Sequence, residues 1–201
     1  QKMCSRYQSP DDAEMARYYR VNKPKLPVIK STIYPGYAAP VLISPNANGA
    51  HIEARFWGFV LNMPGKKDPS KIVSKILQNA VSETVAEKRT FSKAWREGHR
   101  CILPATRFFE PVDGEFKGIF DPDSPILSFA GIWSEQTYRE KKVDACTMLT
   151  CEPNKWVSKH HDRMPVILHR EDVDEWLSPD TSPEQALKLC KPWSGALGLT
   201  S

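Results

Sequence analysis

Runs of aromatic and β-branched residues make up much of the chain and are separated by proline- and glycine-rich breaks. Such runs are typical of β-strands that bury at least one face. We therefore expect strands at residues 39–44, 53–61, 101–110, 126–133, 143–151 and 165–168. Between the first two, Asn46-Ala47-Asn48-Gly49 predicts a hairpin turn, because Asn and Gly accept the positive φ that tight turns require.

Helix signals are fewer. Ser9-Pro10-Asp11-Asp12 supplies a hydroxyl cap, a proline in the first turn and acids at the positive end of the dipole, which predicts a helix to about Arg20. Asp68-Pro69 is interpreted in the same way, with an apolar helix face at 72, 73, 76 and 77. A third helix is expected over 82–97, ending at Gly98. Shorter helical segments are expected at 154–160, 170–177 and 183–189.

These elements neither alternate as β-α-β units nor separate into a helical and a strand half. We therefore predict an α+β fold, with a curled, barrel-like mixed β-sheet flanked by short helices. A chain of 201 residues fits one domain, so 1–201 is interpreted as a single domain with its core at about 3–189.

Composition narrows the class of protein. A hydrophobic fraction of 40% with 26% charged residues is that of an ordinary globular protein. The net charge of +4 permits a polyanionic partner without requiring one. An odd set of five cysteines with no C-x-x-C pair indicates a reducing compartment rather than a disulfide framework. With no long apolar run and no signal-like start, we expect no membrane contact and a cytoplasmic location.

Cys4 is the first candidate for chemistry. A free thiol has a pKa of about 8.5, which nearby positive charge lowers, and Arg6 is placed to help. A cysteine at the very terminus would also carry an α-amine of pKa about 8 beside the thiol. Together these two groups capture aldehydes, because the amine forms an imine and the thiol closes a thiazolidine. The alternative is a buried cysteine that behaves as a small hydrophobe.

His160-His161-Asp162-Arg163-Met164-Pro165 is the second candidate, because a histidine here is placed to shuttle protons, with either Asp162 or a backbone carbonyl to fix its tautomer. A solvated loop with a capping Asp and a paired Arg is the alternative. Two adjacent histidines are also a possible pair of metal ligands. No third ligand stands at a recognisable spacing, so we predict no metal site.

Two further polar residues follow apolar runs. Glu110, after two aromatic residues, is either partly desolvated with a raised pKa or an outward-facing strand residue. Asn79 is either an amide that holds a reacting oxygen or the C-terminal residue of the preceding predicted helix.

The order of these residues resembles a known family. The segments that carry the resemblance are Met3-Cys4-Ser5-Arg6, Phe56-Trp57-Gly58, Asn79-Ala80, Glu83-Thr84, Phe109-Glu110 and His161-Asp162-Arg163-Met164-Pro165. They occur in the order of the SOS response-associated peptidase (SRAP) family, also called abasic site processing proteins. The resemblance covers roughly residues 3–189.

The resemblance implies a protein of the DNA-damage response that crosslinks covalently to abasic sites in single-stranded DNA, with lyase-like chemistry and no cofactor. It assigns Cys4 as the nucleophile, Asn79 as the residue that orients it, Glu110 as acid/base, and His161 as the proton donor or acceptor for sugar-ring opening. It also implies phosphate contacts from three arginines, Arg6, Arg89 and Arg163. We expect a monomer that associates with the nucleoid when bound to DNA.

Several positions depart from the family pattern. Gln1, Lys2 and Met3 precede Cys4, so its nitrogen in this sequence is a peptide nitrogen, which cannot close a thiazolidine. Either these residues are removed or the protein lacks the crosslinking reaction. The remaining departures are Ser5 for a glycine, Thr32 for an asparagine, Val81 for an arginine, and Met63-Pro64-Gly65 for an aromatic wedge, with Lys66 and Lys67 nearby as alternative phosphate contacts.

Two other functions fit the same residues. In the first, Cys4 activated by His161 removes the residues before it, as an autoprocessing cysteine peptidase. In the second, the chain is a diverged, non-catalytic module that binds single-stranded DNA reversibly.

Overall fold

The computed structural model describes residues 4–44 and 49–200. Its strands are β1 (Tyr7–Gln8), β2 (Thr32–Ile33), β3 (Ala38–Ile43), β4 (His51–Trp57), β5 (Phe59–Pro64), β6 (Ile72–Leu77), β7 (Asn79–Val81), β8 (Arg100–Ala105), β9 (Arg107–Val112), β10 (Glu115–Phe120), β11 (Leu127–Tyr138), β12 (Lys141–Cys151), β13 (Met164–Pro165), β14 (Ile167–Leu168) and β15 (Gly198–Leu199). Its helices are α1 (Asp12–Tyr19), α2 (Arg89–Arg96), α3 (Val173–Leu177) and α4 (Pro183–Leu189), with the 3-10 turns η1 (Ser82–Thr84), η2 (Val157–Lys159) and η3 (Arg170–Asp172).

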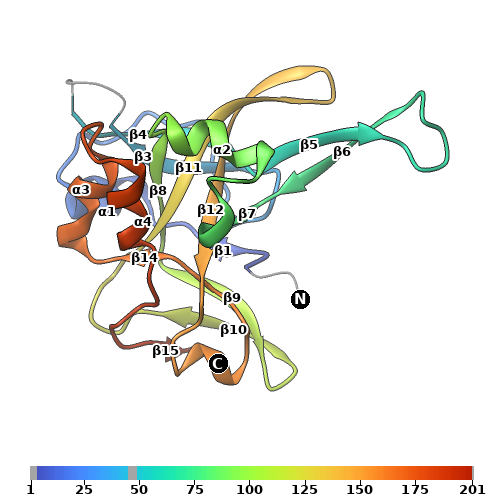
Figure 1. The fold of residues 1–201 in the computed structure, drawn as a ribbon. Helices are drawn as coiled ribbons and strands as arrows, with labels where there is room; N and C mark the ends of the chain where they lie inside the picture. Colours follow the sequence, from blue (N-terminus) through green and yellow to red (C-terminus); the bar gives the residue numbers. More distant parts are fainter. Residues whose placement is uncertain (1–3, 45–48, 201) are drawn as a thin grey trace.

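Five strands close into a barrel. Strand β12 pairs with β4, β4 with β3, β3 with β8, β8 with β11, and β11 returns to β12. The β12–β4 pair is parallel and the other four are antiparallel. Short helices flank this barrel, with α1, α3 and α4 together on one side (Figure 1). The predicted α+β fold with a barrel-like mixed sheet is confirmed.

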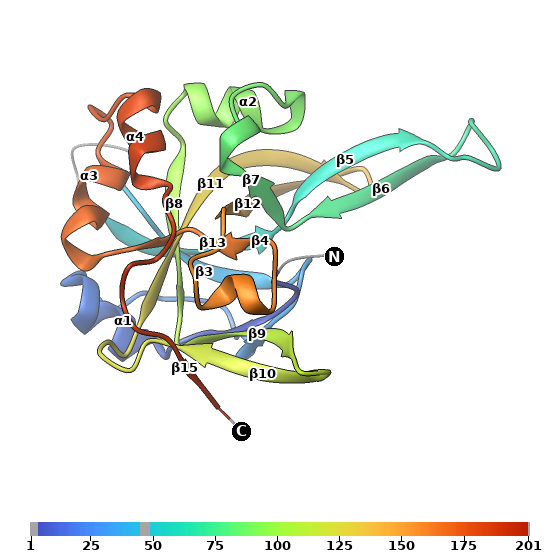
Figure 2. The same ribbon diagram turned by 60° about the horizontal axis from the view of Figure 1, so that its bottom comes forward.

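A second sheet, in the order β15-β10-β9-β1-β2, lies against the barrel (Figure 2). In its middle, β1 pairs with β9 through Tyr7 opposite Phe108. Both side chains are fully buried, and the Tyr7 ring packs edge-on against Trp57 and Phe129 of the barrel. This packing fixes β1 in the core and sets Cys4, three residues before Tyr7, beside β9.

The segment before Asn79 is a strand, so the predicted helix over 68–77 is wrong. Residues 72–77 form β6, which pairs residue by residue with β5 from Phe59 opposite Leu77 to Pro64 opposite Ile72. An apolar set at 72, 73, 76 and 77 fits a helix face as well as a strand. Cross-strand pairing decides between the two, and three of the four residues are β-branched types that favour strands.

Three of the predicted strands are each two strands. Residues 53–61 divide at Gly58 into β4 and β5, 101–110 at Thr106 into β8 and β9, and 165–168 at Val166 into β13 and β14. Each division moves the chain to a different partner strand. Sequence runs alone do not show such corners, because both halves are apolar.

The helix boundaries also shift. The predicted helix over 82–97 is the turn η1 followed by α2, and α1 is capped by Asp11, whose side chain accepts a hydrogen bond from the N–H of Glu14, rather than by Ser9. Most of the predicted turn Asn46-Ala47-Asn48-Gly49 lies outside the described residues. Across the described ranges, no helix is long and apolar enough to cross a membrane.

Replacing Gly58 with alanine is expected to destabilise the fold by about 3 kcal/mol, because strain and overpacking add. Gly58 has φ +132°, and a Cβ here would stand 2.2 Å from Cγ2 of Ile76. Urea denaturation measures the loss. Gly114→Ala is the matched control, since Gly114 also has a positive φ (+83°) but open space around it. Equal losses for both variants would show that the close approach of Ile76 to Gly58 costs nothing.

Candidate active site

Cys4 precedes β1 and is completely buried. Its φ is +33°, which a residue with a Cβ adopts only at an energetic cost. Its Sγ lies 3.7 Å from the carbonyl oxygen of Arg6, to which the thiol donates. In this conformation the backbone nitrogen of Cys4 faces Glu110 of the neighbouring strand β9.

Glu110 reaches Cys4 from β9. The backbone N–H of Cys4 donates to Oε1 of Glu110 at 2.5 Å, and Glu110 is only 2% exposed. Burial raises the pKa of Glu110 to about 7, although the hydrogen bond from Cys4 favours the charged form. Of the two interpretations of Glu110, the desolvated carboxyl is confirmed and the outward-facing strand residue is wrong.

His161 lies on the other side of the same carboxyl group. Its Nε2 is 3.0 Å from the carbonyl oxygen of Pro111 and 3.6 Å from Oε2 of Glu110. A carbonyl only accepts hydrogen bonds, so Nε2 carries the proton in this contact. His161 follows η2, whose first turn is held by the side chain of Asn154.

Asn79, the first residue of β7, is the fourth residue of the site. Its Nδ2 donates to the carbonyl oxygen of Cys4 at 3.5 Å. Strand β7 is held in place by pairing with β12 and by Trp57, whose Nε1 donates to the carbonyl oxygen of Gln78. The interpretation of Asn79 as a helix C-terminal residue is therefore wrong.

Of the two interpretations of Cys4, the lowered thiol pKa is wrong and burial of the side chain is confirmed. Burial first, and the charge of Glu110 second, raise the pKa of Cys4 well above its ordinary value. The guanidinium of Arg6 instead packs over the rings of Phe109 and Phe116, 4.9 and 4.7 Å from their centres. Any reaction at this thiol must therefore remove its proton during the chemical step.

The pattern of the family described as SOS response associated peptidase (SRAP) matches residues 3–200. The chain belongs to the SRAP family. It is 37% identical to Abasic site processing protein YoaM of Bacillus subtilis over 144 residues, which are 68% of this chain and 61% of YoaM. It is 27% identical to Abasic site processing protein YedK of Escherichia coli over 167 residues, 81% of this chain and 71% of YedK. The match thus spans about three-fifths of the Bacillus relative.

Solved structures share this fold. A crystal structure of a protein from Bordetella bronchiseptica superposes with a TM-score of 0.79 at 22% identity, covering 98% of this chain and 100% of that one. A crystal structure of a protein from Bacteroides thetaiotaomicron gives a TM-score of 0.77 at 21% identity, covering 98% of this chain and 90% of that one.

The three predicted phosphate-contacting arginines differ in their surroundings. Arg163 makes a bidentate ion pair with Glu83, at 2.9 and 2.6 Å, and also donates to the carbonyl oxygen of Thr150. Arg89 is exposed at the first residue of α2. Arg6 contacts Cys4 through its backbone, because its carbonyl oxygen accepts from the Cys4 thiol. A phosphate that binds Arg163 therefore competes with Glu83.

The structure identifies partners of two site residues, His161 and Arg163, that the SRAP motifs do not name. A backbone carbonyl was one of the two partners expected for the histidine, and the structure identifies it as that of Pro111, which the sequence does not show. Glu83 lies in one of the motifs, but the sequence does not show that it pairs with Arg163, 80 residues away. In the described part of the chain, no three His, Cys, Asp or Glu side chains cluster as a metal site.

Glu110 is expected to make the folded SRAP protein less stable as the pH rises. Its pKa is raised from 4.5 to about 7 in the fold, so the folded state binds this proton more tightly than the unfolded state does. The stabilisation is complete below pH 4.5 and disappears as the pH rises through 7, a change of about 3 kcal/mol at 1.36 kcal/mol per pKa unit.

Urea denaturation at low and high pH tests this. Glu110→Gln should lose about 3 kcal/mol less than the wild type between pH 4.5 and pH 8. Glu115→Gln changes an exposed carboxylate on the adjacent strand and should follow the wild type. A Glu110→Gln variant with wild-type pH dependence would show that this carboxyl titrates normally.

Proposed function

We propose that this SRAP protein captures abasic sites in single-stranded DNA by closing a thiazolidine at Cys4, protecting the damaged strand. The observation that carries the proposal is the placement of the Cys4 nitrogen on a buried carboxyl group of pKa about 7, with the thiol of the same residue beside it. The names of the relatives YoaM and YedK support the same substrate.

The chemistry follows from the four side chains. The ring-opened deoxyribose presents an aldehyde carbon, and the free amine of Cys4 adds to it. Glu110 accepts a proton from the attacking nitrogen and returns it to the hydroxyl that leaves as water, for which a pKa near 7 is well suited. The thiol then adds to the imine carbon, and its proton passes to the nitrogen. One aldehyde and one cysteine thus give one thiazolidine and one water.

The other two residues position the reactants. Asn79 holds the carbonyl of Cys4, so that the nitrogen and the thiol keep their direction. His161, oriented by the Pro111 carbonyl and 3.6 Å from Glu110, serves as the proton donor or acceptor when the sugar ring opens. A neutral, buried thiol suits this sequence, because it reacts only when an imine is present to take its proton.

The test uses protein that starts at Cys4 and a single-stranded oligonucleotide whose uracil has been removed by uracil glycosylase. The proposal predicts a protein–DNA band that survives heating in denaturant. It predicts no such band with the same strand left untreated by the glycosylase. Binding that is only reversible and falls steeply with salt would instead identify a non-covalent DNA-binding module.

A second function, removal of the residues before Cys4, is favoured by the strained backbone there. The positive φ of Cys4 and the contact of its N–H with Glu110 both act on the peptide bond that would be cut. In this reaction Glu110 accepts the thiol proton as the sulfur attacks the carbonyl of Met3, and delivers it to the leaving nitrogen. That step frees the amine that capture requires and leaves the Met3 acyl group on the sulfur as a thioester. Water then hydrolyses the thioester, which restores the thiol.

Intact-mass measurement of the full sequence tests self-processing. The chain should lose the mass of Gln1-Lys2-Met3 on incubation, and Glu110→Gln should retain it. Loss at the same rate in Cys4→Ala would mean that another enzyme removes these residues.

A further inference from the structure

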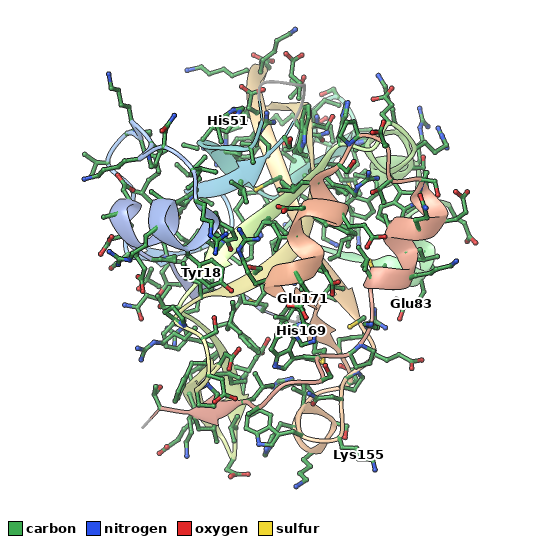
Figure 3. The ribbon with its side chains drawn as sticks, turned by 90° about the vertical axis from the view of Figure 1, so that its left-hand side faces the viewer. Tyr18, His51, Glu83, Lys155, His169 and Glu171 are labelled. Atoms are coloured by element: carbon green, nitrogen blue, oxygen red, sulfur yellow. The ribbon has the colours of Figure 1, made fainter. Side chains whose placement is uncertain are left out.

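The segment after α4, residues 191–200, crosses the molecule as a strap. It runs from α4 to β15, which pairs with β10 (Figure 2). Near its start, Trp193 is 8% exposed and its ring stacks on His169, with 4.3 Å between the ring centres. His169 and Lys155, the residue after Asn154, both lie on the side of the molecule seen in Figure 3. The strap is therefore packed against the body of the protein.

Asn154 joins this strap to the turn that ends at His161. Its Nδ2 donates to the carbonyl oxygen of Trp193 at 2.9 Å. Its Oδ1 accepts from the N–H groups of Trp156 and Val157, at 3.1 and 2.8 Å. A side-chain amide has a donor end and an acceptor end, and here one end holds the strap while the other holds η2.

The same loop places His161. The N–H of His161 donates to the carbonyl oxygen of Val157 at 2.9 Å, and Val157 is only 1% exposed. Three residues after His161, Sδ of Met164 accepts from the backbone N–H of Asn154 at 3.3 Å. Asn154 therefore fixes both ends of the loop that carries His161.

The far end of the strap supports the strands that carry Glu110. Strand β15 pairs with β10, and beyond it the N–H of Thr200 donates to the carbonyl oxygen of Gly118 at 2.8 Å. Strand β10 pairs in turn with β9, with Lys117 opposite Glu110. One segment thus contacts the supports of both Glu110 and His161, whose Oε2 and Nε2 lie 3.6 Å apart.

We propose that Asn154 is a positioning residue for His161, and that its bond to the strap sets the spacing of His161 from Glu110. The role rests on the proposed function, in which His161 transfers the proton when the sugar ring opens. Asn154 then governs ring opening and not the later additions of the amine and the thiol. A misplacement of about 1 Å at a reacting group costs about 100-fold in rate.

The experiment compares two single strands in single-turnover crosslinking to protein that starts at Cys4. One strand carries the abasic deoxyribose, whose aldehyde is mostly closed in a ring. The other carries an aldehyde on an acyclic linker with no hydroxyl in reach, so that no ring has to open. Asn154→Ala should slow reaction with the abasic sugar about 10- to 100-fold, and His161→Ala at least as much. Both variants should react with the acyclic aldehyde as the wild type does.

Three further variants separate positioning from a loss of structure. Asn154→Asp should also react slowly with the abasic sugar, because a carboxylate caps the turn but repels the carbonyl oxygen of Trp193. The double variant Asn154→Ala/His161→Ala should be no slower than His161→Ala alone, since Asn154 acts through His161. Asp11→Ala is the control, because it removes the cap of α1, where Asp11 accepts from the N–H of Glu14 at 2.8 Å. It should crosslink to both strands as the wild type does.

Two results would overturn the role of Asn154. One is equal slowing with both aldehydes in Asn154→Ala, which would mean that Asn154 acts on the whole fold or on Cys4. The other is a double variant in which the losses of the two single variants multiply. Glu110→Gln should slow both strands, because the proton of the attacking nitrogen has to move in either reaction.

The ring N–H of His161 gives a readout that needs no DNA. Its Nε2 proton, held by the carbonyl oxygen of Pro111, should exchange slowly with water in ¹⁵N NMR spectra of the wild type and of Asp11→Ala. Exchange should be much faster in Asn154→Ala and Asn154→Asp, and wild-type exchange in these variants would overturn the inference. A wild type that forms no heat-stable product with either strand would overturn the proposed function instead.

Discussion

Cys4→Ser protein that starts at residue 4 is expected to form no heat-stable product with abasic DNA. The serine variant keeps the amine and the neighbours of Cys4, so it still forms an imine with the aldehyde. It lacks the sulfur that closes the five-membered ring, and the imine hydrolyses when the complex is denatured. Denaturing gels after heating measure the product.

Cys190→Ser is the control for this experiment, because Cys190 follows α4 and its thiol donates to the carbonyl oxygen of Ala186 rather than to a residue of the Cys4 site. It should crosslink as the wild type does. Reversible binding of the Cys4→Ser variant, measured in native gels, should also be unchanged. A heat-stable product from Cys4→Ser at the wild-type yield would mean that another nucleophile carries the reaction.

Glu110→Gln is expected to slow crosslink formation by about 10²- to 10⁴-fold, the usual contribution of a positioned acid/base. Glutamine keeps the size of the side chain, but it neither accepts nor releases the proton of the Cys4 nitrogen. The wild-type rate should fall on the acid side as Glu110 is protonated, at or below about pH 7, because the freed ammonium beside it favours the carboxylate.

Single-turnover rates from pH 5 to 9 measure both effects. The acid-side fall should disappear in Glu110→Gln, a change that a purely structural role for Glu110 does not produce. Glu115→Gln serves again as the exposed control. If Glu110→Gln crosslinks at the wild-type rate at every pH, the proton transfer assigned to Glu110 is wrong.

The sequence predicted the fold class because runs of aromatic and β-branched residues, and the small number of helix signals, are local features of the chain. It failed at residues 72–77, where the same apolar set fits a helix or a strand and only the partner β5 decides. It also joined β4 to β5 and β8 to β9, because a corner between two apolar strands depends on which sheet each half enters.

The site shows the same division. The family motifs named Cys4, Asn79, Glu110 and His161 as one site, and the fold places these four residues together. The carboxyl group of Glu110 lies against the Cys4 nitrogen and His161, and Asn79 donates to the carbonyl oxygen of Cys4. The sequence left the thiol of Cys4 open between a lowered pKa and a buried side chain. Burial decides between the two, and it depends on the whole core rather than on neighbours in the sequence.

The central claim is a thiazolidine between Cys4 and the abasic sugar. Tandem mass spectrometry of the proteolysed crosslink, with and without borohydride treatment, tests it most directly. The account predicts that the sugar is attached to the N-terminal Cys4 peptide with loss of one water, and that borohydride adds no hydrogen, because a thiazolidine has no imine to reduce. Attachment at a lysine, or a mass increase of two hydrogens on reduction, would contradict it.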